Sequence, residues 1–277
     1  MVMNEVKSRI STDPDGKRVY LMSMHTDDLP IIIDYLDQLA VSNGYTKIFV
    51  KVRAMYSPVF YMAGYIMEAF VPGYYNGNDD AFFMAKYFDD ERRFPENNVL
   101  RLFKDMMLTA KGNKHLLPVD NAFKLKMLKE EDVHSMVDVF KVVFDSYPFP
   151  IFEPTFLVSS MQEGTRYYGI FDNNYLVAVS SAECDEKYQS AEMTDFAVLS
   201  SYRGKSFALL LLEYMEKDLQ KLGYRTLFTI ARLHELSMNK TFLNAGYQYS
   251  GTLNKNTQIA GRIESMNVWY KHLNVIL

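Results

Sequence analysis

The sequence predicts an α/β fold (α+β, with a mixed sheet) that is divided into two units. Three observations predict it. Strand-like runs alternate with apolar residues at helical spacing, part of this pattern occurs twice, and a basic turn with a glycine joins a strand to a leucine-rich helix. The chain has 277 residues, of which 48% are hydrophobic. This is enough for two modest domains, each with a core.

A weak internal repeat relates the first part of the chain to the last part. The matching segments are Asp34–Asp37 with Glu213–Glu216, Gly44–Phe49 with Gly223–Phe228, and Phe60–Tyr65 with Phe242–Tyr247. The first two segments are separated by the same spacing in both copies. Each copy is therefore predicted to form a helix, a strand, a second helix and two further strands.

Helical spacing of apolar residues predicts the helices of the repeat, and β-branched or aromatic runs predict its strands. The helix residues are Ile32, Leu36 and Leu39 in the first copy, and Leu211, Met215, Leu219 and Leu222 in the second. The strands are Ile48–Val52 and Leu227–Ile230. Gly64 and Gly246 are placed to end the second helix of each copy, because glycine adopts the left-handed conformation readily.

The boundary is predicted near residues 111–118, with a first unit of residues 1–115 and a second of residues 120–277. The second unit begins before the repeat and contains elements that the first unit lacks. In chain order we expect a strand (Phe123–Leu128), a helix (Lys129–Phe144), a loop with two prolines (Tyr147–Ile151), a short helix (Thr155–Met161), a hairpin (Arg166–Phe171 with Tyr175–Glu183), a strand (Glu192–Val198) and a helix (Phe207–Leu222).

The turn Arg203-Gly204-Lys205-Ser206 lies between that strand and the helix that begins at Phe207. The first N–H groups of a helix have no partner inside the helix and carry partial positive charge. Arg203 and Lys205 add full positive charges. A turn of this kind can bind a diphosphate group.

The same turn resembles the acyl-CoA loop of the GCN5-related N-acetyltransferases (the GNAT superfamily), whose pattern is Gln/Arg-x-x-Gly-x-Gly/Ala. Arg203, Ser206 and Ala208 fall on this pattern, with serine in place of the middle glycine. The order of elements from Phe123 onwards is also similar to that of the GNAT fold. The resemblance implies an N-acetyltransferase that uses acetyl-CoA as co-substrate, preceded by a half-GNAT-like unit.

Further stretches resemble a narrower group, the β-lysine N-acetyltransferases. They are Gly64–Tyr65, Glu68–Tyr75, Ala81–Tyr87, Tyr147–Ile151, Ala191–Ala197, Thr229–Arg232 and Ile263–Lys271. This resemblance spans nearly the whole chain. It implies acetylation of a small amino acid, above all β-lysine, by direct attack in a ternary complex. The product, Nε-acetyl-β-lysine, is a compatible solute used in osmoadaptation.

The first copy of the repeat lacks a matching cofactor turn. The register that places Arg203–Lys205 in the second copy places Met24–Thr26 in the first, followed by Asp27 and Asp28. An acidic segment without glycine should repel a diphosphate. The first 110 residues are therefore interpreted as a half-domain without cofactor binding, which completes the substrate pocket or a dimer interface. Chance similarity between two α/β units is the alternative.

The resemblance also implies which residues contact the cofactor. Backbone groups of Phe196, Ala197 and Val198 would pair with the pantetheine arm where the strand bulges away from its neighbour. An N–H near Ala197 or Val198 would then donate to the thioester oxygen. The remaining cofactor residues are Arg203, Gly204, Lys205, Ser206, Phe207, Ala208, Asn239 and Phe242. A plain central strand, and a helix-surface role for Asn239, are the alternatives.

Relatives use a tyrosine as the acid that protonates the leaving thiolate, in the pattern Phe-Tyr-x-x-x-Gly. Counting back from Gly246 places Phe242 at that tyrosine, so the role is vacant or moved. Tyr247, Tyr249 and Tyr270 are the substitutes that the sequence offers.

The acceptor amine must lose a proton before it attacks, because an ammonium of this kind has a pKa of about 10.4. The usual position of the family's carboxylate corresponds to Thr194 here, which cannot act as a base. Glu192 lies two residues earlier on the same strand face and is the first choice. Asp195 faces the other way unless a bulge redirects it, and Glu264 is the third candidate.

An amino-acid substrate also needs a partner for its carboxylate. Arg232 could bind it through two parallel hydrogen bonds, and Arg166 and Arg262 compete for this role. Tyr147, Phe149 and Glu153 belong to the segment where the fold places its substrate lid. Packing in the core is the alternative role of the aromatic residues.

Composition limits the other function classes. The net charge of −4 argues against a nucleic-acid binder. The single cysteine, Cys184, excludes an internal disulfide, and with no signal peptide or membrane span detected we expect a cytoplasmic protein. No histidine or cysteine cluster has metal-ligand spacing, so we expect neither a metal nor a covalent acyl-enzyme.

Two alternatives to β-lysine acetylation remain open from the sequence. The first is a regulatory protein that binds acyl-CoA and has lost catalysis, which the serine in the loop and the missing tyrosine favour. The second is acetylation of another amine, such as lysine, a polyamine or a protein N-terminus. The sequence also leaves a homodimer open.

Overall fold

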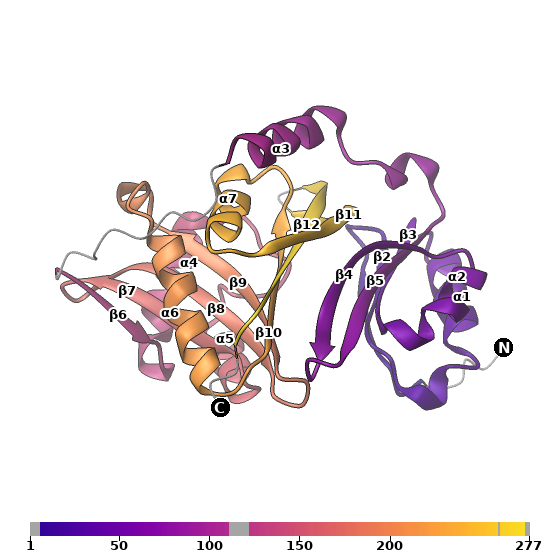
Figure 1. The fold of residues 1–277 in the computed structure, drawn as a ribbon, viewed down its shortest axis with the longest axis horizontal. Helices are drawn as coiled ribbons and strands as arrows, with labels where there is room; N and C mark the ends of the chain where they lie inside the picture. The colour runs from indigo at the N-terminus through magenta and orange to yellow at the C-terminus, as the bar shows by residue number, and fades with distance from the viewer. Residues whose placement is uncertain (1–5, 111–121, 260, 275–277) are drawn as a thin grey trace.

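The computed structural model describes residues 6–110, 122–259 and 261–274. The boundary predicted at residues 111–118 lies outside the described residues. Two sheets form the framework (Figure 1). One has the strand order β1-β2-β3-β5-β4, and the other has the order β11-β12-β10-β9-β8-β7-β6.

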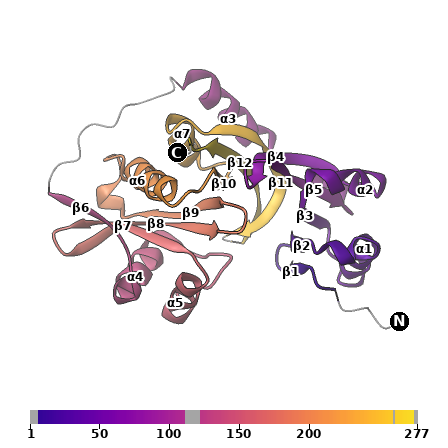
Figure 2. The same ribbon diagram turned by 60° about the horizontal axis from the view of Figure 1, so that its bottom comes forward.

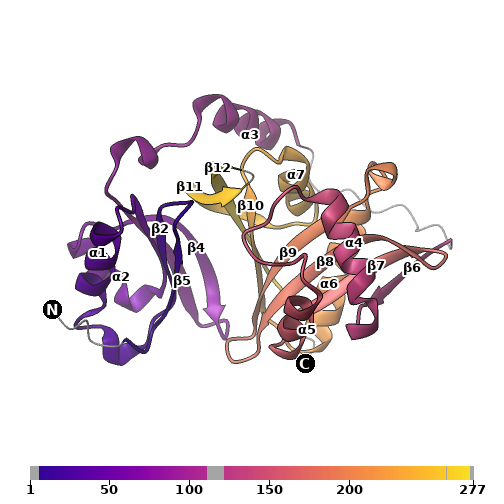
Figure 3. The ribbon, with the colours of Figure 1, turned by 180° about the vertical axis from the view of Figure 1, so that it is seen from behind.

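The N-terminal half carries two helices on the outer face of its five-stranded sheet, away from the second sheet (Figure 3). Its elements are β1 (Arg9–Asp13), β2 (Arg18–Ser23), α1 (Ile32–Ser42), β3 (Lys47–Arg53), α2 (Ser57–Met62), β4 (Ile66–Tyr75), β5 (Asp79–Tyr87) and α3 (Asn97–Thr109). The sequence patterns missed the β1–β2 hairpin and α3. Helix α3 leaves its own half and packs on the other, where Phe103 contacts Trp269 at a ring-centroid distance of 6.1 Å.

The C-terminal half places α4 and α5 on one face of its sheet and α6 and α7 on the other (Figure 2). Its elements are β6 (Phe123–Met127), α4 (Val133–Val143), α5 (Pro154–Gln162), β7 (Arg166–Asp172), β8 (Tyr175–Asp185), β9 (Ser190–Val198), α6 (Phe207–Lys221), β10 (Thr226–Arg232), α7 (Leu236–Asn244), β11 (Gln248–Ile259) and β12 (Arg262–His272). The predicted order of elements is confirmed, with boundaries moved by a few residues.

The first sheet has the same order and strand directions as part of the second. Strands β1-β2-β3-β5-β4 correspond to β8-β9-β10-β12-β11, and β2–β3 and β9–β10 are the parallel pairs. Tyr20 pairs with Phe49 in the first sheet, as Glu192 pairs with Phe228 in the second. The two halves therefore share an architecture, and Tyr20 takes the position of Glu192.

A hydrophobic core joins the two halves. Phe49, Val71 and Phe83 from one half pack with Phe228 and Val268 from the other, and all five are buried. The rings of Phe83 and Phe228 lie 6.2 Å apart. Burial of five large apolar side chains stabilises the contact by about 1.5–3 kcal/mol each. The space between the halves is thus bordered by a fixed, packed interface.

A buried polar group also crosses this interface. The Lys47 Nζ donates to Glu68 Oε2 at 2.8 Å and to the Asn254 carbonyl at 2.7 Å. Burial lowers the pKa of Lys47 to about 8, and the Glu68 carboxylate opposes that change. The pair links β3 and β4 to β11 of the other half.

Strand β11 touches β4 so closely at Gly251 that no side chain fits. A Cβ atom there would lie 2.1 Å from the carbonyl oxygen of Glu68. We expect Gly251→Ala to lower the free energy of unfolding by about 1–3 kcal/mol, because the two backbones must separate. Denaturant unfolding measures this. Gln248→Ala, at an exposed site on the same strand, should change stability by less than about 0.5 kcal/mol. Equal effects would mean that the halves do not pack tightly here.

Candidate functional site

The parallel strands β9 and β10 separate part-way along their length. Their pairing runs from Ser190–Thr226 to Glu192–Phe228 and then stops. Beyond Glu192, the backbone of β9 has no partner in β10, so its polar groups are free for another molecule. The opening leads into a cleft of about 1520 Å³, which is lined by residues of both halves.

A β-bulge on the other edge of β9 explains the separation. Val179 pairs with Ala197 and Ser181 pairs with Thr194, so Asp195 and Phe196 together face one residue of β8. Asp195 has a left-handed backbone (φ 54°), a conformation that aspartate tolerates better than most residues. The bulge turns Asp195 to the face of Thr194, where its carboxylate accepts hydrogen bonds from Ser181 (2.5 Å) and Tyr147.

The basic turn forms one end of the cleft. Gly204 (φ 82°) and Ser206 (φ 61°) are both left-handed, and α6 starts immediately afterwards at Phe207. The Ser206 side chain does not cap the helix, so the first N–H groups of this 15-residue helix stay available. Arg203 and Lys205 are exposed beside them. These features fit a diphosphate, and all six predicted residues from Arg203 to Ala208 line the cleft.

Two carboxylates stand side by side in the cleft, Glu192 on β9 and Glu183 on β8. They are direct partners in the antiparallel register, and both line the cleft. Burial raises the pKa of Glu183 to about 7 and that of Glu192 to about 8, and repulsion between neighbouring carboxylates adds to this. Two such groups titrate as a pair. The sequence analysis missed Glu183, although the register of its hairpin would have placed it opposite Glu192.

Asp195 is the third carboxylate of this cluster. Burial raises its pKa, while the hydrogen bonds from Ser181 and Tyr147 oppose that change. Since these two donors already hold the carboxylate, Asp195 is less available to a substrate than Glu192. Tyr147 and Phe149 reach the cleft from the α4–α5 loop.

The N-terminal half forms the opposite wall of the cleft, which sequence reasoning did not assign. Arg18, Tyr20, Phe49 and Lys51 line it from β2 and β3. The Lys51 Nζ donates to the Tyr74 hydroxyl at 3.0 Å. Lys51 is also close enough to both Glu183 and Glu192 to lower their pKa values. No short-range sequence pattern relates β3 to β9, so only the fold brings these residues together.

Asn239 does not reach the cleft, so its predicted contact with the cofactor is wrong. Its side chain is fully buried and all of its hydrogen-bonding capacity is used. The Nδ2 donates to the carbonyls of Arg232 and Glu235, both at 2.9 Å. The Oδ1 accepts from Asn267 (2.8 Å) and Trp269 (2.9 Å). Asn239 thus fixes α7 to β10 and β12.

Arg232 and Glu264 occupy each other. The Nε and Nη2 of Arg232 donate to the two carboxylate oxygens of Glu264, both at 2.6 Å. Arg232 lines the cleft but has no free fork for a substrate carboxylate, and Glu264 does not line the cleft. Their predicted roles as clamp and third base therefore do not fit the geometry.

Other predicted residues are placed elsewhere. Glu153 is exposed just before α5 and outside the cleft lining, as is Arg262 on β12. The methyl group of Ala197 is buried and also absent from the lining, so only its backbone can serve the cofactor. Phe242 lines the cleft, 5.6 Å from the ring of Phe196, whereas the substitute tyrosines do not line it. These tyrosines are Tyr247, Tyr249 and Tyr270.

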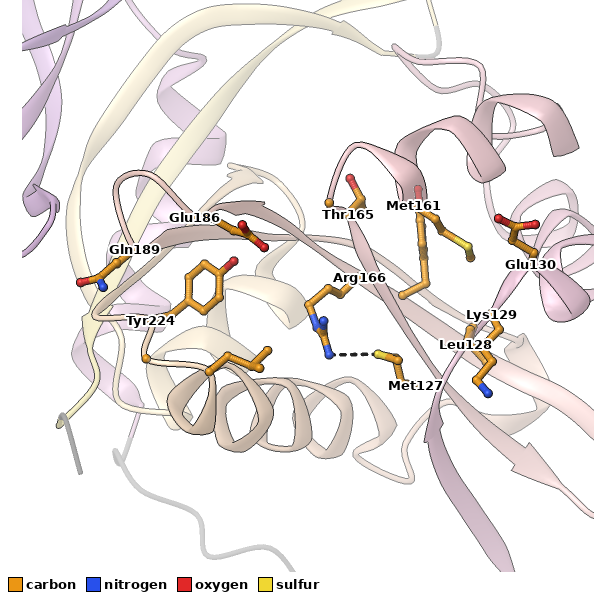
Figure 4. A pocket seen from close by; sticks show the side chains of 14 residues that line it. Met127, Leu128, Lys129, Glu130, Met161, Thr165, Arg166, Glu186, Gln189 and Tyr224 are labelled. Atoms are coloured by element: carbon orange, nitrogen blue, oxygen red, sulfur yellow. Dashed lines mark hydrogen bonds between the residues drawn. The ribbon is translucent and has the colours of Figure 1, made fainter. Parts of the chain in front are cut away.

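Arg166 belongs to a second cavity, of about 550 Å³, at another part of the C-terminal half (Figure 4). It points toward Met127, with a contact of 3.1 Å, and it pairs with Asp218 at 3.0 Å. Arg166 is therefore excluded as the substrate clamp of the cleft.

Two searches of the described residues gave no candidates. Within residues 6–110, 122–259 and 261–274, no group of three or more His, Cys, Asp or Glu side chains is arranged to hold a metal ion. No helix in the same ranges combines the length and apolar character that a membrane crossing requires.

Comparison with known proteins identifies relatives over almost the whole chain. A family model described as "Acetyltransferase (GNAT) family" matches residues 133–247. The β-lysine N(6)-acetyltransferase of Methanococcus maripaludis is 39% identical over 259 residues, which are 92% of each chain. The N-acetyltransferase YodP of Bacillus subtilis is 31% identical and covers 82% of each chain.

A solved structure is also similar to part of the chain. The ribosomal-protein-S18-alanine N-acetyltransferase of Escherichia coli superposes with a TM-score of 0.49 at 14% identity. The match covers 55% of this chain and 94% of the other.

Proposed function

The chain belongs to the GNAT family of N-acetyltransferases, and on this premise we propose that it transfers the acetyl group of acetyl-CoA to an amine of β-lysine, giving Nε-acetyl-β-lysine. The observation that carries the proposal is the 39% identity over 92% of the chain to a relative named for this reaction. The cleft supports it independently, because one end suits a diphosphate and the other presents carboxylates to an amine.

Three parts of the cleft would hold acetyl-CoA. The turn Arg203–Ser206 and the first N–H groups of α6 would bind the diphosphate. The unpaired backbone of β9 after Glu192 would pair with the pantetheine arm, and an N–H at Ala197 or Val198 would face the thioester oxygen. Acetyl-CoA supplies the acetyl group as a thioester, whose C–S bond is exchanged for a C–N bond to the amine.

Glu192 is the proposed general base. Its raised pKa makes it a stronger proton acceptor than an ordinary glutamate, and it is still partly ionised near neutral pH. Glu183 beside it shares the charge of the arriving ammonium and passes a proton on to solvent through the open cleft. Asp195 and Tyr147 position the adjacent backbone of β9.

The thiolate would leave without a dedicated tyrosine acid. Phe242 stands at that position, and the three substitute tyrosines lie outside the cleft lining. Proton return through cleft water is sufficient, because a thiolate is a good leaving group at neutral pH. The regulatory alternative has no support, since the relatives that match most of the chain are named as acetyltransferases.

The biological setting is the finer part of the proposal. We place the enzyme in the cytoplasm, and its product as a compatible solute in osmoadaptation. The N-terminal half is proposed to be a degenerate copy of the C-terminal half of a GNAT unit, as the shared strand order suggests.

A thiol-release assay with acetyl-CoA tests the activity. The acceptors are β-lysine, lysine, spermidine and a peptide with a free N-terminus. We expect kcat/KM to be highest for β-lysine, with mass spectrometry showing one acetyl group on N6. Turnover of spermidine but not of β-lysine would reject the substrate, and turnover of none with retained acetyl-CoA binding by calorimetry would favour the regulatory alternative.

A further inference from the structure

The wall that the N-terminal half contributes to the cleft carries a lysine, Lys51, near the middle of β3. It shares the cleft with the carboxylates Glu183, Glu192 and Asp195 of the opposite wall. The cleft thus presents both signs of charge to whatever binds between the halves. This arrangement is complementary to a molecule that carries amines and a carboxylate.

Lys51 has a polar contact but no ion-pair partner of its own. Its Nζ donates to the Tyr74 hydroxyl at 3.0 Å and lies 5.0 Å from the centre of that ring. Among the described residues, it takes part in none of the ion pairs found, whereas Lys47 and Lys86 on the same sheet are each paired with a carboxylate. An ammonium enclosed by protein without a counter-ion is unfavourable, so this site gains from an arriving anion.

The other cations of the molecule are committed elsewhere. Arg232 is held by Glu264 and Arg166 by Asp218, and Arg262 is exposed away from the cleft. Arg18 lines the cleft, but its Nη1 donates to the Asn256 carbonyl at 2.7 Å and the Thr257 hydroxyl at 3.1 Å. The carboxylate of Asp13, which also lines the cleft, acts on Arg18 rather than on Lys51. Asp15, on the same β1–β2 turn, is exposed.

We propose that Lys51 binds the carboxylate of the amino-acid substrate, while the acidic wall formed by Glu183 and Glu192 receives the amine to be acetylated. The N-terminal half would then select amino acids over simple diamines, although it has no cofactor turn of its own. This inference rests on the proposed function only in taking the acceptor to be an amino acid with a side-chain amine. It gives the half-domain a chemical role in the reaction.

The test compares two acceptors that differ only in the carboxylate. 1,4-Diaminopentane is β-lysine without its carboxylate. For Lys51→Met we expect the KM of β-lysine to rise about 10- to 100-fold, as loss of a charge-assisted hydrogen bond predicts. The kinetic constants for 1,4-diaminopentane and the KM of acetyl-CoA should stay within about twofold of wild type, because neither contact involves Lys51. The ratio of kcat/KM for the two acceptors is the readout.

Three further variants separate a carboxylate contact from a structural role. Lys51→Arg keeps the charge and should restore most of the preference for β-lysine. Tyr74→Phe removes the hydrogen bond to Lys51 but leaves its charge, and should change the preference by less than about fivefold. Lys86→Met removes a lysine that pairs with Asp37 outside the cleft, and should leave the preference unchanged.

The outcomes distinguish this inference from the proposed function. An equal loss with both acceptors in Lys51→Met, or an unchanged KM for β-lysine, overturns the inference while β-lysine turnover by wild type still stands. If wild type acetylates lysine but not β-lysine, the proposed substrate is wrong, and the comparison is made with lysine and 1,5-diaminopentane. If wild type prefers the diamine in both pairs, the inference is overturned as well.

Discussion

Glu192→Gln is expected to lower kcat for β-lysine by about 10²- to 10⁴-fold, which is the usual contribution of a positioned general base. The side chain keeps its size and its place on β9, so the separation of β9 from β10 and the binding of acetyl-CoA should persist. Steady-state kinetics at saturating acetyl-CoA measure the loss. Glu264→Gln removes a carboxylate that Arg232 holds outside the cleft lining, and should affect kcat much less. The reverse order of effects would reassign the base to Glu264.

The pH profile gives a second reading of the same residue. Burial raises the pKa of Glu192 to about 8, so its proton is bound at low pH and the base is lost as the pH falls through that value. Wild-type kcat should therefore rise between about pH 6 and 9, and Glu192→Gln should lose this rise. Glu183→Gln removes a neighbouring negative charge, lowers the pKa of Glu192 and should move the rise to lower pH. A wild-type profile that is flat from pH 6 to 9 contradicts the assignment.

Stability should respond to pH with the opposite benefit. The folded-state pKa of Glu192 lies above the unfolded value of about 4.3, so the folded state binds this proton more tightly. The stabilisation is complete at acidic pH and is lost as the pH rises through the folded pKa. Wild type should therefore lose thermal stability relative to Glu192→Gln between pH 5 and pH 9.

Gly204→Asp is expected to raise the KM and dissociation constant of acetyl-CoA by about 10- to 100-fold. A Cβ atom at this position meets no atom within 4 Å, so steric blocking is not the cause. The new carboxylate lies next to the site of a diphosphate, and like charges a few ångströms apart near a surface repel by about 1–4 kcal/mol. Calorimetry with CoA measures the change.

Gly204→Asn is the matched control for this variant. Asparagine has nearly the same size and tolerates the left-handed backbone that Gly204 adopts (φ 82°), but it carries no charge. It should change CoA affinity by less than about fivefold. Equal losses in both variants would show that backbone strain, rather than charge, controls the loop. Unchanged affinity in both would remove the diphosphate from this turn.

The sequence predicted the parts of the site that depend on local patterns. The turn at Gly204 follows its strand and precedes its helix within a few residues, so spacing alone was enough to place it. The bulge that redirects Asp195 was anticipated as a condition. The order of elements in the C-terminal half was predictable for the same reason, since each strand and helix has its own periodic pattern.

Residues brought together over long distances were not predictable in this way. Lys51 and Glu192 meet only because the two sheets pack against each other. Arg232 and Asn239 were assigned to ligands because their buried partners, Glu264 and Trp269, lie on β12, which is distant in sequence.

The repeat shows the same limit at the level of register. The spacing that aligns Phe49 with Phe228 aligns Tyr20 with Leu199, whereas the sheets align Tyr20 with Glu192. The connection from β9 to α6 is longer, with the bulge and the cofactor turn in it, than the connection from β2 to α1. An alignment without gaps therefore misplaced the first copy's loop against Arg203–Lys205.

A crystal structure of the enzyme with CoA and β-lysine tests the site most directly. The pantetheine arm is expected along β9 after Glu192, the diphosphate at the N-terminus of α6, and the N6 amine within hydrogen-bond distance of Glu192 or its water. A CoA molecule bound outside the opening between β9 and β10, or an amine directed away from the Glu183–Glu192 pair, would contradict this arrangement.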